Sequence, residues 1–183
     1  MILNTLIGNQ KGDTHTMNQS NTLQILKKAF LMEQQGKNLY ETARDKAGSE
    51  EVKAFFQELA QDEQEHMDIL EKQLKSIMET GNFIAGDYKT DDTAEASSDI
   101  LDNVLIDKIN AASFEATAIT AAVSFEDKAV KLYAQRAKES DDPEEKKIYN
   151  WLSAWESTHL KKLMALQEAL MEKVWNDNDF WPL

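Results

Sequence analysis

The sequence predicts an all-α fold, a four-helix bundle made of two helical hairpins joined by one long crossover. Apolar residues recur at helical spacing along four long segments. The 183 residues include only 6 Gly and 2 Pro, which suits long uninterrupted helices. The chain also contains an internal repeat, because one pattern of Glu, Tyr and His residues appears in both halves at an offset of 93 residues.

The first hairpin is expected to consist of two helices joined by a short turn. The first helix spans about residues 21–47, and Gly48 is placed to end it in the left-handed conformation. Ser49 is a suitable N-cap for the second helix, which runs to about residue 80 and stops at Gly81. Because the turn is short, the two helices are predicted to be antiparallel neighbours.

The second hairpin follows a long connection. The pattern breaks after Gly81, and a short helix is expected at about residues 100–109. The third long helix spans about residues 111–138. Asp142 then caps a fourth helix that runs to about residue 175, with Pro143 in its first turn. A connection of about thirty residues is long enough to travel back along the bundle, which is how a one-crossover bundle is connected.

The chain is expected to be one bundle domain with short segments at both ends. The bundle covers residues 21–175, after a flexible leader at 1–20 and before an apolar tail at 176–183, which folds back onto the bundle or contacts a partner. The leader lacks the pattern of a signal peptide, and no apolar run reaches the roughly 20 residues that cross a membrane. We therefore expect a cytoplasmic location without membrane association.

Charge and cysteine content exclude several classes of function. The formal net charge of −13 argues against nucleic acid as a partner, since phosphate binding needs clustered Lys and Arg. The absence of Cys excludes disulfides and thiolate sites for zinc or iron–sulfur clusters. Redox chemistry would then need a metal held by oxygen and nitrogen ligands, or an external partner.

The repeat places the same candidate ligands in both halves of the chain. In each half, a lone Glu is followed thirty residues later by a Glu-x-x-His motif, whose two side chains face the same way on a helix. The six residues are Glu33, Glu63, His66, Glu126, Glu156 and His159. All lie on predicted apolar faces, where four carboxylates would be very costly without counter-charge. The pattern therefore predicts a site for two metal ions in the core, and such ligands accept iron, manganese or zinc.

An alternative interpretation is that the apolar faces are slightly rotated and these residues lie on the bundle edges, as a relic of duplication. It leaves unexplained why the polar residues fall in the apolar phase of all four helices. Asp62, beside one motif, is expected to be solvated, like most acidic residues on a helix.

Four aromatic residues near the motifs have more than one interpretation. Tyr40 and Tyr133 follow the lone Glu residues by two turns, so they either donate hydrogen bonds to ligand carboxylates as an outer shell or are ordinary core tyrosines. Trp151 and Trp155 are one turn apart, and packing or a dimer surface explains them more simply than electron transfer.

The repeated pattern of Glu, Tyr and Glu-x-x-His resembles the rubrerythrin-like branch of the ferritin-like di-iron carboxylate proteins, over about residues 22–172. The resemblance implies a ferritin-like bundle with a dinuclear iron centre. It implies that Glu63 and Glu156 bridge the two ions. The lone Glu of each half would be a terminal carboxylate, and each His would bind one ion.

The chain departs from that resemblance in two ways. Classical rubrerythrins carry a rubredoxin domain with four Cys, whereas this chain has none, so electrons would come from a separate protein. They also carry a further Glu three residues before the second lone Glu, where this chain has Val123. That Glu takes part in the family's iron movement during peroxide reduction, so Val123 counts against the same cycle here.

The leading hypothesis is a non-haem di-iron oxidoreductase that reduces hydrogen peroxide or O₂ with electrons from an external donor. A second hypothesis is a ferroxidase or iron-sequestering protein. A third is a metal-binding helical scaffold that acts through partner contacts. A homodimer is expected from the resemblance alone.

Overall fold

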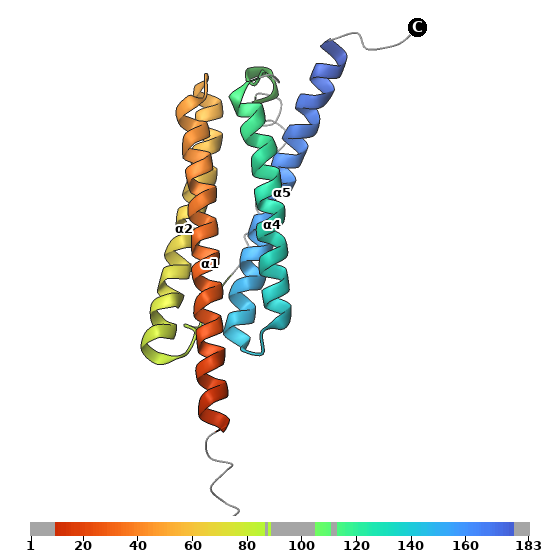
Figure 1. Ribbon diagram of the computed structural model, residues 1–183. Helices are drawn as coiled ribbons and strands as arrows, with labels where there is room; N and C mark the ends of the chain where they lie inside the picture. The colour runs from red at the N-terminus through yellow and green to blue at the C-terminus, as the bar shows by residue number, and fades with distance from the viewer. Residues whose placement is uncertain (1–9, 87, 89–104, 111–112, 178–183) are drawn as a thin grey trace, which may run out of the picture.

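Four long helices make up most of the part of the chain that the computed structural model describes, which is residues 10–86, 88, 105–110 and 113–177. They are α1 (Gln10–Lys46), α2 (Glu50–Thr80), α4 (Phe114–Glu139) and α5 (Pro143–Asp177). The helices α1 and α2 form one antiparallel hairpin, and α4 and α5 form the other (Figure 1). The described residues contain no β-strand, so the predicted all-α bundle of two hairpins is confirmed.

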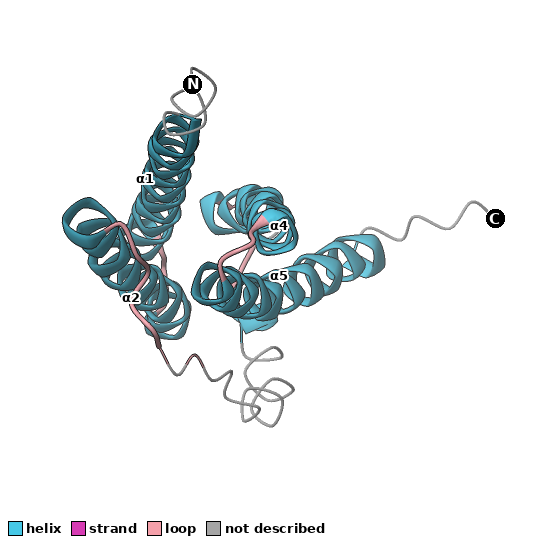
Figure 2. Cartoon of the chain, turned by 90° about the horizontal axis from the view of Figure 1, so that it is seen from below, coloured by secondary structure: helices cyan, strands magenta, loops and turns pink. Residues whose placement is uncertain are grey.

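The two hairpins lie side by side, with α1 against α4 (Figure 2). In Figure 1, α2 ends at the bottom of the bundle and α4 begins at the top, so the two helix ends that the connection joins lie at opposite ends of the bundle. Of the short helix predicted at 100–109, residues 105–108 are helical, and residues 100–104 lie outside the described ranges. Leu105 and Ile109 are buried, so this segment contributes to the core.

Side-chain and backbone caps fix three helix ends as the sequence predicts. The hydroxyl of Ser49 accepts a hydrogen bond in the first turn of α2, and Gly81 ends α2 with a φ of 76°. Asp142 Oδ1 accepts hydrogen bonds from two backbone N–H groups in the first turn of α5, at 2.8 and 3.1 Å. Pro143 is the first residue of α5, where its missing N–H has no helical partner to lose.

Two predictions about the first helix are wrong. α1 begins at Gln10, so residues 10–20 continue the helix rather than belonging to a leader. No proline interrupts this stretch, so nothing removes a backbone donor from the helix. Gly48 is not left-handed, because Gly81 is the one described glycine with positive φ. Instead, the Gly48 N–H donates to Glu115 Oε1 at 3.1 Å, which ties the first hairpin turn to α4.

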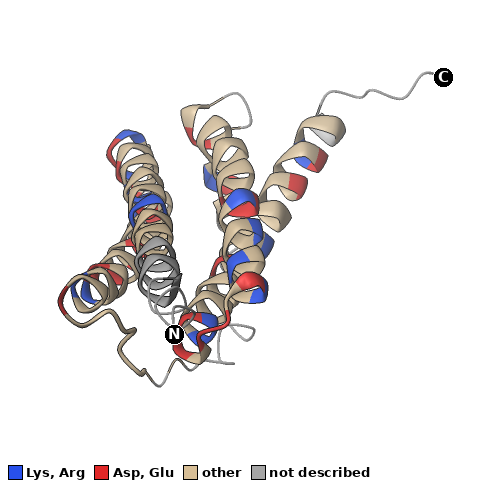
Figure 3. Cartoon of the chain, turned by 60° about the horizontal axis from the view of Figure 1, so that its bottom comes forward, with Lys and Arg blue, Asp and Glu red and all other residues tan. Residues whose placement is uncertain are grey.

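The predicted end segments lie mostly outside the described ranges. Residues 1–9 and 178–183 are not described, and α5 continues to Asp177, two residues into the predicted tail. None of the helices in the described ranges has the length and hydrophobicity of a membrane-crossing segment. Acidic and basic residues are interspersed along the helices (Figure 3).

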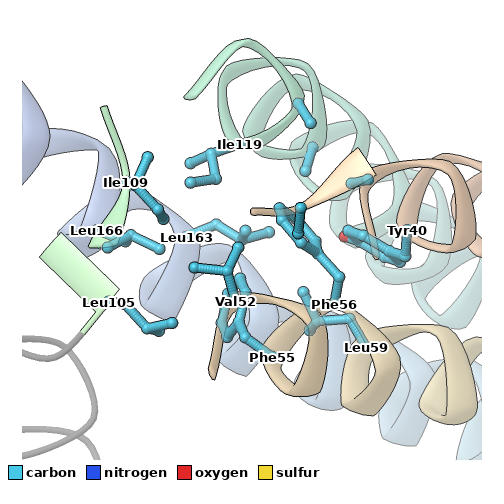
Figure 4. Packing of buried hydrophobic residues seen from close by; sticks show 14 of the residues in the cluster. Tyr40, Val52, Phe55, Phe56, Leu59, Leu105, Ile109, Ile119, Leu163 and Leu166 are labelled. Carbon is cyan, nitrogen blue, oxygen red and sulfur yellow. The ribbon is translucent and has the colours of Figure 1, made fainter. Parts of the chain in front are cut away.

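Buried apolar side chains form two clusters, one toward each end of the bundle. The first cluster includes Tyr40, Phe56, Ile119 and Leu163 (Figure 4). The second cluster includes Leu26, Leu70, Ala129, Tyr133 and Leu152. In every long helix, the candidate ligands lie in sequence between the residues of one cluster and those of the other. The packing therefore leaves one polar layer across the middle of the bundle.

Candidate metal centre

The middle layer contains all six predicted ligands, and none of them is more than 1% exposed. The helices α1 and α4 each contribute one carboxylate, while α2 and α5 each contribute a carboxylate and an imidazole. The residues are Glu33, Glu63, His66, Glu126, Glu156 and His159. The alternative interpretation, that these side chains lie on the bundle edges, is therefore wrong.

The six side chains form two groups of four that share two members. One group contains Glu33 and His66, the other contains Glu126 and His159, and Glu63 and Glu156 belong to both. Within each group, one ligand atom per residue can be chosen so that all lie within 4.8 Å of one another. Shared carboxylates at the centre and an unshared carboxylate and imidazole on each side are the arrangement that two neighbouring ions require.

Glu156 shows the shared arrangement most directly. Its Oε1 lies 2.9 Å from His66 Nδ1, and its Oε2 lies 3.2 Å from His159 Nδ1. Each oxygen of this one carboxylate therefore faces the imidazole of a different half of the repeat. The geometry agrees with the bridging role that the resemblance implies for this residue.

The two tyrosines connect the halves crosswise. The Tyr40 hydroxyl donates to Glu126, and the Tyr133 hydroxyl donates to Glu33. Of the two roles that the sequence left open, the structure shows the hydrogen-bonding one, since each Tyr is buried and contacts the lone Glu of the other half. Burial and the nearby Glu126 charge raise the pKa of Tyr40 well above its usual value, so its hydroxyl stays a donor.

The imidazoles differ on the side away from the cluster centre. His159 Nε2 lies 2.9 Å from Asp62 Oδ2 and 3.2 Å from Trp155 Nε1. The His66 ring instead packs nearly perpendicular to Trp151 and Trp155, at ring-centroid distances of 5.6 and 5.5 Å. The packing interpretation of the two tryptophans is confirmed.

The expectation that Asp62 is solvated is wrong, because its side chain is only 23% exposed and contacts His159. The spacing of Asp62 in the sequence did not predict this contact, since an Asp on a strongly acidic helix usually faces water. Its position directly before Glu63 was the one available signal.

Without a metal, protons offset the charge of this cluster. Burial, assisted by neighbouring carboxyl groups, raises the pKa values of Glu33, Glu63 and Glu126. Burial alone would lower the pKa of His159, but hydrogen bonds to Asp62 and Glu156 raise it to about 10. The raised values mean that the buried carboxyl groups retain protons that a cation would displace.

The imidazoles have the opposite effect on the carboxylate between them. Burial would raise the pKa of Glu156, but the charges of His66 and His159 and their hydrogen bonds lower it instead. His66 in turn has a raised pKa, because the Glu156 charge outweighs the burial that would lower it.

Several buried atoms lack the partners that a metal ion would supply. Both carboxylate oxygens of Glu63, Oε2 of Glu126 and Nε2 of His66 make no hydrogen bond with the described residues. Carboxylate oxygens without donors, beside imidazole nitrogens, are a donor set for iron, manganese or zinc. At Gly36, an added Cβ would lie 3.0 Å from Glu63 Oε1 and 2.9 Å from the Phe125 ring, so the glycine leaves room for this carboxylate. The residues fit a pair of divalent ions.

A family model described as Rubrerythrin matches residues 24–167, most of the chain. The chain belongs to the rubrerythrin family. The family is one of di-iron carboxylate proteins, and the buried cluster of this rubrerythrin-family chain can hold metal. Comparisons with curated proteins and with solved structures gave no match.

Proposed function

We propose that the protein is a non-haem di-iron oxidoreductase that reduces hydrogen peroxide or O₂ with electrons from an external donor. The observation that carries this proposal is the pair of buried ligand groups that share Glu63 and Glu156. Membership of the rubrerythrin family supports iron as the metal. Manganese or zinc would satisfy the same ligands, so the metal is part of the proposal.

The bound metal would supply two electrons to the O–O bond, one from each iron ion. The protein supplies a fixed set of four carboxylates, whose negative charge favours the more highly charged oxidised pair. The hydroxyls of Tyr40 and Tyr133 hold the terminal carboxylates in place, which limits their rearrangement when the charge changes. The apolar clusters on both sides of the polar layer exclude bulk water from it.

Electrons are proposed to come from a separate protein. The sequence contains no Cys, so it cannot form the thiolate iron site of a rubredoxin domain. Val123, where classical rubrerythrins have a further Glu, is partly buried against the first apolar cluster. The proposed chemistry therefore depends on six ligands, four carboxylates and two imidazoles, without a further carboxylate at that position. A cytoplasmic location and a homodimer belong to the same proposal.

The experiment is to load the metal-free protein anaerobically with Fe(II) and to mix it with hydrogen peroxide or O₂ in a stopped-flow instrument. We expect about two irons per chain, oxidation that is faster with peroxide than with O₂, and reduction again by an added electron donor. His66→Ala and His159→Ala should each lower iron content and activity while leaving the helical circular dichroism unchanged.

Two other outcomes would favour the rival functions. Faster oxidation by O₂, with continued uptake beyond two irons per chain, would replace the proposal with iron oxidation and sequestration. Failure of the wild-type protein to bind stoichiometric metal, even after loading, would replace it with a helical scaffold that acts through partner contacts.

A further inference from the structure

Asp62 and Trp155 occupy equivalent positions in the repeat, each directly before the Glu of a Glu-x-x-His motif. Both side chains reach the imidazole of the opposite half. Asp62 Oδ2 lies 2.9 Å from His159 Nε2, whereas the Trp155 ring lies 5.5 Å from the His66 ring between centroids. The repeat therefore preserves the ligands but places a carboxylate behind one imidazole and an indole behind the other.

The carboxylate of Asp62 selects one tautomer of His159. A neutral imidazole that binds a metal through Nδ1 must hold its proton on Nε2. An ionised carboxylate only accepts hydrogen bonds, so its 2.9 Å contact requires a proton on His159 Nε2. Asp62 therefore stabilises the tautomer whose Nδ1 is open to a metal.

The indole of Trp155 favours the other tautomer. Its Nε1–H only donates, so its 3.2 Å contact with His159 Nε2 is a hydrogen bond only when that nitrogen lacks a proton. In that tautomer the proton sits on Nδ1 and blocks the metal. Asp62 and Trp155 thus compete for His159 Nε2. A metal bound at Nδ1 favours the hydrogen bond to Asp62, because the proton must then be on Nε2.

His66 lacks the corresponding support. Its Nε2 is buried and makes no hydrogen bond with the described residues, and two tryptophan rings pack against the imidazole. In the metal-binding tautomer, this nitrogen would carry an N–H group without an acceptor, which costs free energy. The structure therefore stabilises the metal-binding tautomer of His159 but not that of His66.

We infer that the two metal positions are inequivalent, that the position next to His159 binds a divalent cation first and more tightly, and that Asp62 is the positioning residue responsible. This inference rests on the metal cluster of the proposed function. Removal of an outer-shell partner of a metal-binding His typically lowers affinity by about 10- to 100-fold, so we expect a separation of that size between the two binding steps.

The first test is a titration of the metal-free, full-length protein with Co(II) alone, followed by visible absorption and by counting bound ions in native mass spectrometry. We expect two resolved steps in the wild-type protein. Asp62→Ala should weaken the tighter step by about 10- to 100-fold and make the two steps merge. His159→Ala should remove the tighter step, and His66→Ala should remove the weaker one.

Matched variants separate the effect of the Asp62 hydrogen bond from the effect of net charge. Asp62→Asn keeps an acceptor but removes one negative charge, so it should weaken the tighter step less than Asp62→Ala. Glu65→Gln removes the same charge from an exposed site on α2 and should leave both steps unchanged. Equal weakening of the tighter step by Asp62→Ala and Glu65→Gln would show that only net charge matters, and would overturn the role of Asp62.

A second readout reports the tautomer directly. The sequence contains 3 His, so nitrogen–proton correlation spectra of the Zn(II)-loaded protein are readily assigned. We expect His159 to show a hydrogen-bonded Nε2–H proton that exchanges slowly with water, and Asp62→Ala to lose that protection. A variant that merely lost structure would also change its circular dichroism and its His66 signals. If only the His159 signal is lost, the cause is the missing hydrogen bond to Asp62.

The outcomes distinguish this inference from the proposed function. Two ions that bind with equal affinity, or a tighter step that Asp62→Ala leaves unchanged, would overturn the inference while the metal centre stands. A wild-type protein that binds no Co(II), Zn(II) or Fe(II) would overturn both.

Discussion

The hairpin α1–α2 and the hairpin α4–α5 present the same ligands but surround them with different side chains. Asp62 of the first corresponds to Trp155 of the second, and the exposed Glu58 corresponds to the buried Trp151. Two ions with shared carboxylates require matching ligands from both halves, whereas the residues behind the ligands are free to differ. Differences in the behaviour of the two metal positions should therefore arise from these surrounding residues.

The largest expected effect comes from removing a carboxylate that both positions share. Glu63→Ala should lower the affinity for both ions by about 100-fold or more, because a direct ligand contributes more than the outer-shell partners. Glu33→Ala removes a carboxylate of one group only and should weaken one step. Titration with Co(II) measures both. Loss of only one step in Glu63→Ala would contradict the shared position of this residue.

The next effect is on stability as a function of pH in the metal-free protein. Burial raises the pKa values of Glu33, Glu63 and Glu126, and contacts with carboxylates raise that of His159 to about 10. For a raised pKa, the folded state holds more protons than the unfolded chain. The stability that each such group contributes is fully present below its pKa in the unfolded chain. It is lost as the pH rises through the pKa of the group in the folded state.

We therefore expect the metal-free protein to lose roughly 2–5 kcal/mol of unfolding free energy between pH 6 and pH 9. The pKa of Glu156 is lowered, so its contribution to stability changes only when the pH falls below the usual value of 4.5, outside this window. Urea unfolding at both pH values measures the difference. With Zn(II) bound the trend should reverse, because the metal replaces the protons. The same trend with and without Zn(II) would contradict metal binding at these groups.

Removing the hydroxyl of Tyr40 or Tyr133 should have a smaller effect on metal affinity, and each change should weaken only one metal position. Tyr40→Phe removes the hydroxyl that donates to Glu126, and Tyr133→Phe removes the one that donates to Glu33. A hydrogen bond to a charged group contributes roughly 1.5–3 kcal/mol, so we expect a loss of about 10- to 100-fold in affinity at one position for each variant. Tyr40→Phe should affect the step assigned to His159, although Tyr40 belongs to the other half of the sequence from His159. Weakening of the His66 step by Tyr40→Phe would contradict the crosswise arrangement.

The smallest effect should come from Gly36, whose equivalent in the second half is Ala129. In Gly36→Ala, the new Cβ meets the Glu63 carboxylate and the Phe125 ring, which must shift by a few tenths of an ångström. We expect metal affinity to fall by roughly tenfold or less. The matched variant Ala129→Gly should destabilise α4 by about 1 kcal/mol and leave metal affinity nearly unchanged. Equal metal affinity in wild type and Gly36→Ala would show that Glu63 does not need this space.

The sequence predicted the features that depend on periodicity. Burial of Glu33 and Glu126 followed from their place in an apolar phase, and the caps at Ser49 and Asp142 followed from local hydrogen bonding. These features need only the position of a residue along one helix. The two hairpins and the set of six clustered residues could therefore be predicted from the pattern of residues alone.

Features that depend on contacts between helices could not be predicted in this way. The Gly48 N–H finds an acceptor on α4, which replaces the left-handed cap that local sequence favours. The contact of Asp62 with His159 and the crosswise tyrosine bonds depend on how α2 and α5 or α1 and α4 are rotated against each other. Periodicity gives the buried face of a helix but not which side chain of a neighbour it meets.

The most direct test of the metal centre is the iron content of the protein after anaerobic Fe(II) loading and removal of free iron. The comparison includes wild type, His66→Ala and His159→Ala, all checked for helical content. We expect about two irons per chain in wild type and one or fewer in each variant. An iron content that is the same in all three proteins, or no stoichiometric iron in wild type, would contradict a metal centre built from these six side chains.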